Sequence, residues 1–309
     1  MSDGQSPRFF SFGCSFTNYR WPTWADIMAA NFEHHENWGK VGAGNYFIAN
    51  SIIECDLKNK ITSHDIVAIM WSSVARLDSY KNQAWQTPGN IYNQKYYSLP
   101  VVQALADDRG FYIRDLCAIY STQRLLDSIG CQWFMFCMTD ITRPSEWDNH
   151  DVSSDVQDIL DFFRPTLIKI KPSIHQVIFN YDWFSRPFVG KKLHDLQKHY
   201  QEVAGPDWPP LETVVKDQRP HLTDQNVWDE IFDLSKWDWK KLFHEHQRED
   251  SHPTPLEHLE YIKRVVPDWS ISSETYSILA EIDNLIRTDQ PIKPELMIQI
   301  KKSQPVKRW

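Results

Sequence analysis

Short apolar runs alternate with amphipathic stretches along the first half of the chain. Three runs predict β-strands: 8–12, 65–71 and 131–138. Three stretches with apolar residues at helical spacing predict helices: 21–32, 46–57 and 115–129. The second and third strands show no polar alternation, which is typical of strands buried on both faces of a parallel sheet. The alternation of strands and helices therefore predicts an α/β fold, a three-layer α/β/α sandwich with a mostly parallel sheet of the flavodoxin-like type.

The second half of the chain has a less regular pattern. It predicts a long helix over 152–170, a short strand over 176–180 and a helix that starts at His252 and runs through Val265. We expect one domain over 1–266 that carries an inserted, Trp-rich cap. The predicted bounds are about 142–245 for the cap and 267–309 for a helical C-terminal appendage.

Composition narrows the classes of partner. The chain has 309 residues, of which 41% are hydrophobic, and its net charge is -8. A mildly acidic chain lacks the clustered cations that bind a phosphate backbone, so we expect no nucleic-acid partner. The basic cluster near the C-terminus, 301–308, is expected to be a solvated end. The 14 Trp residues favour a heavy aromatic core over a sugar- or protein-binding surface.

The cysteines and the apolar runs bear on location. The five cysteines are odd in number and contain no close pair, which favours free, mostly buried thiols in a reducing compartment. No run approaches the roughly 18 apolar residues of a membrane span, and no N-terminal stretch has the pattern of a signal peptide. We expect a cytoplasmic protein without a membrane partner, and release by a non-Sec route stays open.

Ser15 stands between the first predicted strand and the helix that follows it. The free amides at a helix start, and the amide of Ser15 itself, are placed to stabilise a developing oxyanion. A serine hydroxyl is inert at its ordinary pKa, so it needs a base within hydrogen-bond reach and an acceptor that orients that base. We predict that His252 is this base.

Three sequence blocks in this order resemble the SGNH (GDSL-like) hydrolase family. Residues 13–17 (GCSFT) are similar to its Gly-Asp-Ser-x-Thr/Ser block, and residues 37–42 (NWGKVG) to its Asn-x-Gly-x-x-Gly block. Residues 249–253 (EDSHP) are similar to its Asp-x-x-His-Pro block. The resemblance covers about 8–140 and 245–266. It implies an SGNH-type serine hydrolase without a cofactor, in which the Gly42 amide contributes to the oxyanion hole.

The chain departs from the family pattern in several places. Cys14 replaces an Asp that is not catalytic in the family. The family's Gly-x-Asn-Asp block is absent, and Trp71 and Ser73 stand in its place. Ser73 or Asn45 is then the candidate side-chain oxyanion donor, although Asn45 is equally suited to cap the helix after it. Trp71 and Arg76 are candidate substrate-binding residues, and the alternative for Arg76 is a surface salt bridge.

The acidic partner of His252 stays open between two neighbours. The family spacing favours Glu249, whereas the commoner residue type favours Asp250. A competing interpretation joins His244, His246 and His252 in a metal site, although we assign no metal to the chain; the plainer alternative is a solvated His-rich loop. His34 and His35 are expected on the surface.

The sequence therefore predicts a serine esterase that cleaves carboxylic esters through an acyl-enzyme. Its expected partner is a small-molecule or glycan ester, with an O-acyl group on a glycan preferred. The alternatives are an SGNH-fold protein with weak or lost chemistry that serves as a structural or glycan-binding component, and a metal-dependent hydrolase. The oligomeric state is left open.

Overall fold

The fold is described from a computed structural model, which covers residues 6–93, 96–142, 153–179, 252–288 and 290–309. Its centre is a four-stranded sheet in the order β2-β1-β3-β6, and each neighbouring pair is parallel. The strands are β1 (Phe9–Phe12), β2 (His35–Asn37), β3 (Ile66–Trp71) and β6 (Gln132–Cys137). The predictions of an α/β fold, a mostly parallel sheet and the strands at 8–12, 65–71 and 131–138 are confirmed.

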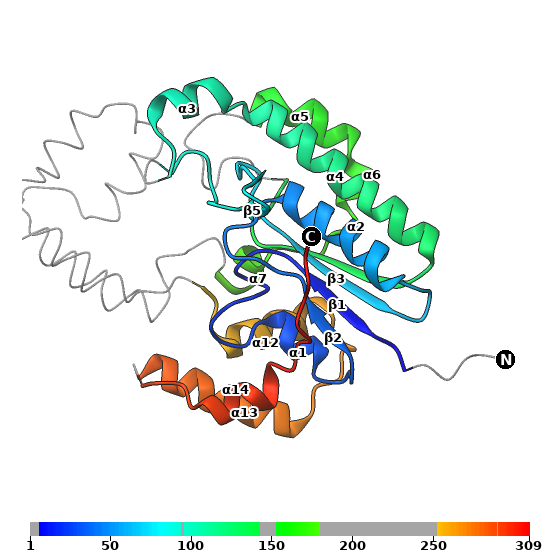
Figure 1. The fold of residues 1–309 in the computed structure, drawn as a ribbon, viewed down its shortest axis with the longest axis vertical. Coiled ribbons are helices and arrows are strands. Elements are labelled where there is room, and N and C mark those ends of the chain that lie inside the picture. The colour runs from blue at the N-terminus through cyan, green and yellow to red at the C-terminus, as the bar shows by residue number, and fades with distance from the viewer. Residues whose placement is uncertain (1–5, 94–95, 143–152, 180–251, 289) are drawn as a thin grey trace, which may run out of the picture. The chain divides into compact units, whose positions relative to one another are not determined.

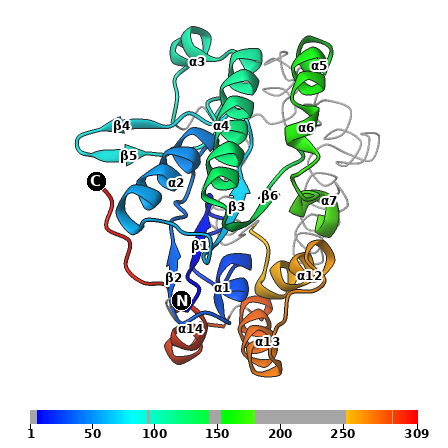
Figure 2. The ribbon, with the colours of Figure 1, turned by 90° about the vertical axis from the view of Figure 1, so that its right-hand side faces the viewer.

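Helices cover both faces of this sheet (Figures 1 and 2). One face carries α2 (Asn45–Asn59) and α4 (Asp108–Ile129), and the other carries α1 (Trp24–Ala29) and α12 (Pro255–Val265). Phe136 of β6 shows how the second face is filled. Its ring lies 5.1 Å from that of Trp24 and 5.8 Å from that of Tyr261, so one strand residue contacts both helices.

The C-terminal helices α13 (Ser273–Arg287) and α14 (Pro294–Ile300) pack on the same side as α1. Leu279 and Ile300 share a buried cluster with Ile27, while Ile282 joins Trp21 in a second one. The helical character predicted for 267–309 is confirmed. These helices belong to the compact unit of the sheet and do not form a separate one.

The last residues of the chain contact the core through Lys301 and Arg308, so the prediction of a solvated basic end is wrong for these two, while Lys302 and Lys307 are exposed. Gln304 forms a parallel bridge with Glu36 beside β2. The Arg308 guanidinium stacks on Trp38 and Phe47, 5.0 and 4.6 Å from their ring centres, and donates hydrogen bonds to the Trp38 carbonyl and to Ser51 Oγ, the latter at 2.9 Å. Aromatic faces and backbone acceptors thus hold a cation that solvent would otherwise surround.

Two predicted elements of the middle region differ in the structure. The helix expected over 152–170 is divided into α5 (Ser153–Phe162) and α6 (Arg164–Leu167), because Pro165 cannot continue the preceding helix. The strand expected over 176–180 is wrong: α7 (Ile174–Phe179) is a helix there. Ser173 Oγ accepts a hydrogen bond from the Gln176 amide at 3.0 Å, and this local cap favours the helix.

Other elements carry no clear signal in the sequence. A two-stranded antiparallel hairpin joins β4 (Ser79–Lys81) to β5 (Ala84–Gln86), and its turn residues Asn82 and Gln83 have positive φ. Helix α3 (Leu99–Leu105) follows. All five cysteines are free and four of them are buried, as predicted.

The chain divides into two compact units. The first consists of Met1–Thr142, Asp155–Ile178 and Pro253–Trp309, and the second of Arg143–Ser154 and Phe179–His252. Residues 155–178 were expected in the cap and group with the sheet. The second unit lies almost wholly outside the described residues.

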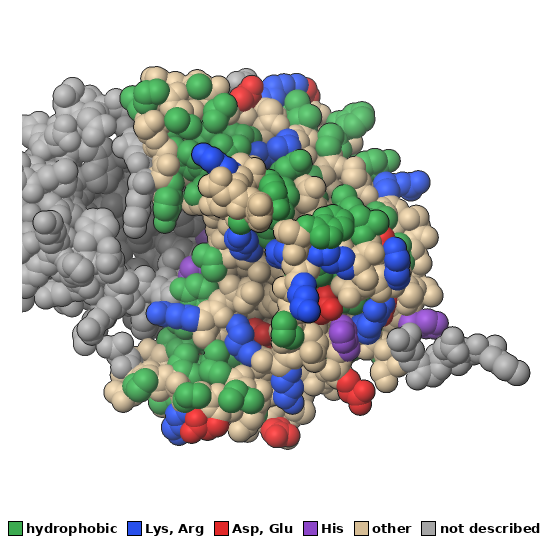
Figure 3. Space-filling model, in the orientation of Figure 1, with side chains coloured by type: hydrophobic (Ala, Val, Ile, Leu, Met, Phe, Trp, Pro, Cys, Tyr) green, Lys and Arg blue, Asp and Glu red, His purple; other side chains and the backbone are tan. Residues whose placement is uncertain are grey.

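The described helices are all too short or too polar to cross a membrane. Figure 3 shows one face of the molecule, on which Lys and Arg side chains stand among hydrophobic and neutral ones and form no continuous basic surface.

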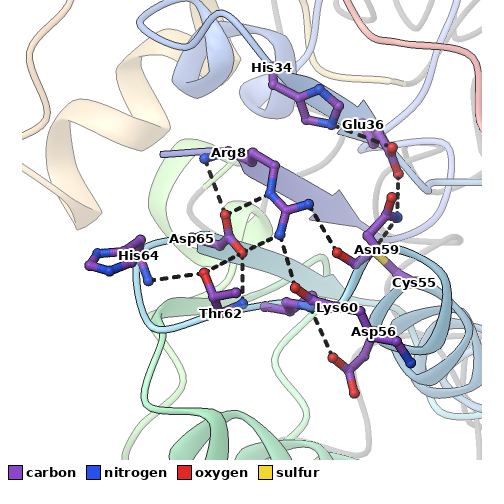
Figure 4. Close-up of polar contacts among 11 residues, drawn as sticks. Arg8, His34, Glu36, Cys55, Asp56, Asn59, Lys60, Thr62, His64 and Asp65 are labelled. Carbon is purple, nitrogen blue, oxygen red and sulfur yellow. Dashed lines mark hydrogen bonds and ion pairs between the residues drawn. The ribbon is translucent and has the colours of Figure 1, made fainter. Parts of the chain in front are cut away.

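The amino end of the sheet is closed by a polar network around Arg8 and Asp65 (Figure 4). These residues directly precede β1 and β3. Arg8 donates to both carboxylate oxygens of Asp65, at 2.9 and 2.6 Å, and to the carbonyls of Asn59 and Lys60 at 3.0 Å. Burial raises the pKa of Asp65, but the hydrogen bonds from Arg8 and Thr62 outweigh it and hold the pKa below the ordinary value.

Candidate functional site

Ser15 lies in a tight turn at the carboxyl end of β1. The Cys14 carbonyl accepts hydrogen bonds from the amides of Thr17 and Asn18, at 3.0 and 3.1 Å. A Cβ at Gly13 would lie 2.0 Å from Thr17 Oγ1 and 2.9 Å from the Met70 carbonyl oxygen, so the turn depends on a residue without a side chain. Helix α1 begins only at Trp24, and the expected free amides of a helix start directly after Ser15 are therefore not present.

Ser15 is 6% exposed as a residue. Within the described ranges neither the Ser15 hydroxyl nor the Ser15 amide makes a hydrogen bond. A hydroxyl and an amide without a partner in the protein are free to bond to water or to a ligand. This turn is therefore the kind of position at which a substrate group binds.

The loop that carries Gly42 runs beside the Ser15 turn. Its start continues the parallel pairing of β1 with β2, since the Trp38 amide donates to the Ser11 carbonyl at 2.7 Å and the Lys40 amide to the Gly13 carbonyl at 3.0 Å. Asn37 joins the two segments, because its Nδ2 donates to the Thr17 carbonyl at 2.8 Å. The structure thus brings the first two sequence blocks together.

Gly42 has a φ of +75°, and a Cβ there would lie 2.0 Å from the Thr87 carbonyl oxygen. Only glycine fits both the left-handed backbone and this close approach. Across the described part of the chain the Gly42 amide donates to no acceptor. It is therefore available as an oxyanion donor.

Asn45 takes neither of its two predicted roles. It is the first residue of α2, whose N-cap is Gly44. Its Oδ1 accepts from the Ser72 amide at 2.7 Å, and its Nδ2 donates to the Ser72 carbonyl at 3.1 Å and to Asp115 Oδ2 at 2.8 Å. Both Nδ2 hydrogens are engaged in these hydrogen bonds. Asn45 therefore connects the end of β3 to α4 and has no hydrogen left for an oxyanion.

Ser73 and Arg76 meet on the loop after β3. Arg76 Nε donates to Ser73 Oγ at 3.2 Å, so the Ser73 hydroxyl keeps its own hydrogen for another acceptor. Arg76 has no carboxylate oxygen within 4.0 Å in the described residues, and the expected alternative of a surface salt bridge is wrong. Its contacts leave the substrate-binding role open.

Trp71, the other candidate substrate-binding residue, is fully buried at the end of β3. Because no part of it is exposed, it belongs to the core, and its assignment to a substrate-binding surface is corrected. Trp21, Trp24 and Trp38 are buried too, as the core interpretation of the tryptophans predicted. The tryptophans of the expected cap lie outside the described residues.

Two carboxylates beside the site, Asp78 and Asp115, lie in no sequence motif and were not predicted. Asp78 accepts from the Gly44 and Phe47 amides, both at 2.9 Å, and so caps α2. Burial raises the pKa of Asp78. Burial also raises the pKa of Asp115 to about 6, although Arg114 and Asn45 bond to the carboxylate and oppose the shift.

Two buried histidines lie against Phe16, the residue after Ser15. The Phe16 ring lies 6.3 Å from that of His175 and 6.4 Å from that of His258, and both histidines are buried. His175 lies in no sequence motif, and His258 follows the His-rich segment that suggests a metal site, so neither was predicted beside Ser15. His35 is buried as well, not on the surface as expected; it pairs with Ser11 Oγ at 3.0 Å, and burial lowers its pKa to about 3.

His252 is half-buried and ends the second compact unit. Pro253 follows it in the first unit, and the Pro253 carbonyl accepts from Trp21 Nε1 at 2.9 Å. The pairing of His252 with Ser15 stays a prediction. Four other predicted residues lie outside the described ranges: His244, His246, Glu249 and Asp250. In the ranges that are described, no three His, Cys, Asp or Glu side chains lie close enough to hold a metal ion.

Comparison of the chain with protein-family models, curated proteins and solved structures found no match.

Proposed function

We propose that the protein is a serine esterase of the SGNH-like type, built as a three-layer α/β/α sandwich. The observation that carries this proposal is the Ser15 turn: its hydroxyl and amide have no partner in the described chain, and the loop beside it presents a second unbonded amide at Gly42. Parallel α/β sheets bind their ligands at the carboxyl ends of the strands, where this turn lies.

In the proposed reaction Ser15 Oγ attacks the ester carbonyl and His252 accepts the hydroxyl proton. The proton then passes to the leaving alcohol, and an acyl-enzyme remains. Water, deprotonated by His252, attacks this acyl-enzyme and releases the carboxylic acid and Ser15. Asp250 or Glu249 would orient the imidazole.

The oxyanion would be held by the amides of Ser15 and Gly42 and by the Ser73 hydroxyl. The Ser73 oxygen accepts from Arg76 Nε, so the hydroxyl keeps its own hydrogen for this role. Asn45 is left out, since both of its amide hydrogens are used. One hydroxyl in place of the family's Asn predicts a slow enzyme, because loss of one oxyanion donor costs about 10²–10³-fold in rate.

The expected substrate is a carboxylic ester on a small molecule or, as the preferred case, an O-acyl group on a glycan. The buried tryptophans of the described chain do not contribute to this preference, which rests on the polar, Trp-rich segment predicted as the cap. The second candidate function is a structural or glycan-binding protein without chemistry. The commitment of Asn45 to Ser72 and Asp115 favours this alternative.

Labelling by a fluorophosphonate and hydrolysis of p-nitrophenyl acetate test the proposal. We expect wild type to be labelled and Ser15→Ala to lose labelling and at least about 10³-fold in rate. Ser63→Ala is the matched control, since Ser63 is exposed at the opposite end of the sheet. Equal rates for wild type and Ser15→Ala, without labelling of either, would exclude the esterase and favour the inactive alternative.

Three histidine variants then identify the base. His252→Ala should lower the rate about as far as Ser15→Ala does, because the two residues act as one unit. His175→Ala and His258→Ala serve as controls next to the same turn. A loss confined to one of these two would move the base away from His252. Activity that survives Ser15→Ala but ends with a chelator would promote the metal-dependent hydrolase.

A further inference from the structure

Arg76 stands where three segments of the candidate site meet. Its Nη1 donates to the Ala43 carbonyl at 3.0 Å, directly after Gly42, and its Nε donates to Ser73 Oγ at 3.2 Å. Its Nη2 lies 3.7 Å from Met138 Sδ, and the same sulfur lies 3.8 Å from Cys14 Sγ. The guanidinium is therefore separated from the neighbour of Ser15 by a single side chain.

Arg76 forms no close ion pair, in contrast to every other partly buried arginine of the described chain. Four arginines of the described chain are partly buried. Three of them have a carboxylate oxygen nearby: Arg8 at 2.6 Å, Arg114 at 2.6 Å and Arg308 at 3.9 Å. Arg76 has none within 4.0 Å. The Arg76 charge helps to lower the pKa of Asp78, but the oxygens of Asp78 accept from two backbone amides.

The guanidinium also keeps hydrogens for a ligand. Arginine has five N–H donors, and the contacts with Ser73, Ala43 and Met138 use one on each nitrogen. One hydrogen remains on Nη1 and one on Nη2. These are the two nitrogens with which arginine binds a carboxylate or phosphate in a two-pronged manner.

The loop that carries Arg76 is held on both sides. The Ala75 carbonyl accepts from the Ile91 amide at 2.9 Å, and the Arg76 carbonyl accepts from Arg114 Nη2 at 2.9 Å. A Cβ at Gly44 would lie 2.8 Å from Arg76 Cβ, so the two loops are packed without space between them. A cation fixed in this way loses little freedom when it binds.

We propose that Arg76 binds an anionic group of the substrate, a carboxylate or a phosphate carried on the acyl or the alcohol side of the ester. This inference rests on the proposed esterase function and narrows its substrate class to negatively charged esters. Arg76 is then a specificity-determining residue. Its effect should depend on the charge of the substrate and not on the ester bond itself.

Three esters separate this role from others: neutral p-nitrophenyl acetate, p-nitrophenyl hemisuccinate with a carboxylate on the acyl side, and 4-acetoxybenzoate with a carboxylate on the alcohol side. We expect wild type to prefer one of the two anionic esters. Arg76→Ala should lower kcat/KM for that ester about 10- to 100-fold more than for the neutral ester, chiefly through KM, so that the preference for the charged substrate is lost. Arg76→Lys should recover part of the loss. Arg124→Ala, which removes an exposed arginine on α4, should change nothing.

Titration of succinate by calorimetry gives a reading that does not need turnover. We expect binding by wild type and Arg124→Ala and its loss in Arg76→Ala. Equal losses for neutral and anionic esters would overturn the inference and make Arg76 a support of the oxyanion. Activity without any preference for charge, or succinate binding unchanged in Arg76→Ala, would overturn it too. Absence of both labelling and turnover in wild type would instead refute the esterase, while calorimetry would still decide whether Arg76 binds an anion.

Discussion

The two ends of the parallel sheet differ in how far their polar groups are satisfied by hydrogen bonds and ion pairs. At the amino end Arg8 donates to two carboxylate oxygens and two carbonyls, so charge and hydrogen bonds are satisfied together. At the carboxyl end the hydroxyls of Ser15 and Ser72 have no partner in the described chain, and Arg76 has no carboxylate. The first arrangement stabilises the fold, whereas the second leaves groups ready for a ligand.

The pKa values follow the same division. Hydrogen bonds from Arg8 and Thr62 outweigh burial at Asp65 and lower its pKa. Burial outweighs the partners of Asp78 and Asp115 and raises their pKa values. Carboxyl groups with strongly shifted pKa values cluster at functional sites, because catalysis and binding use ionisable groups in environments that do not favour their charged form. The comparison therefore assigns a stabilising network to the amino end and supports the proposal that the carboxyl end carries the site.

Removal of one arginine from each end of the sheet should show the largest difference in stability between the two ends. Arg8→Ala leaves the buried Asp65 carboxylate without its cation and should lower the free energy of unfolding by about 3 kcal/mol. Arg76→Ala breaks no ion pair within 4.0 Å, and Asp78 keeps its two backbone donors, so the variant should cost at most about 1 kcal/mol. Urea unfolding followed by tryptophan fluorescence measures both. Equal losses would mean that Arg76 is as structural as Arg8.

Much of the sheet could be predicted because burial on both faces leaves a strong pattern. The runs that became β3 and β6 are apolar throughout, so no helical spacing competes with them. The Ser15 turn and the Gly42 loop could also be predicted, because both lie in sequence blocks that resemble those of the SGNH family, and the structure shows that each depends on its glycine.

What the sequence did not reveal depends on contacts between distant residues. Asn45 has the sequence position of a cap, yet its role is set by Ser72 and Asp115, far along the chain. Arg308 lies in a basic segment that is typical of a solvated tail. Its contacts with the rings of Trp38 and Phe47 hold it in place, and the sequence does not reveal them. Hydrophobic periodicity carries no information about such pairs, since it records which face is buried and not what lies opposite.

The pH dependence of stability should have opposite signs at the two ends. The pKa of Asp115 is raised from 3.8 to about 6, so the folded state holds its proton more tightly than the unfolded state does. The contribution of Asp115 is then fully present below about pH 4 and falls by about 2–3 kcal/mol as pH rises to about 6. Urea unfolding from pH 4 to 7 should show that Asp115→Asn removes this fall.

Asp65 provides the control of opposite sign. Its pKa is lowered, so its contribution is present above the unfolded pKa and disappears as pH falls. Asp65→Asn should therefore be most harmful near neutral pH and least harmful in acid. If both variants changed stability in the same direction with pH, the division between the two ends would not hold for their carboxylates.

The docked C-terminus links the structural part of the molecule to the Gly42 loop. Arg308→Ala removes the donor to the Trp38 carbonyl and the cation on two aromatic rings, and should lower stability by about 1–2 kcal/mol. Amide hydrogen exchange over 38–44 should become faster in this variant. Lys302→Ala, which removes an exposed cation of the same segment, is the matched control. Unchanged exchange would show that the loop holds its form without the tail.

The smallest expected change in the free energy of unfolding comes from removing one hydroxyl at each end of the sheet. Ser72 is fully buried, and its hydroxyl has no partner in the described chain, while its backbone amide and carbonyl bond to Asn45. Ser72→Ala keeps both backbone bonds and removes only the unsatisfied oxygen. The free energy of unfolding should stay constant or rise by up to about 1 kcal/mol. Thr62→Val removes a hydroxyl that donates to Asp65 at 3.0 Å, and it should cost about 1 kcal/mol.

Urea unfolding and the rate of fluorophosphonate labelling, measured together, distinguish the possible roles of Ser72. A stable variant with slower labelling would mean that the Ser72 hydroxyl serves the chemistry at Ser15. Unchanged labelling would restrict the functional groups of this end to Ser15, Ser73 and Arg76. A loss of more than about 1 kcal/mol would contradict the comparison itself, because it would mean that this hydroxyl is bonded and that the carboxyl end is satisfied in the same way as the amino end.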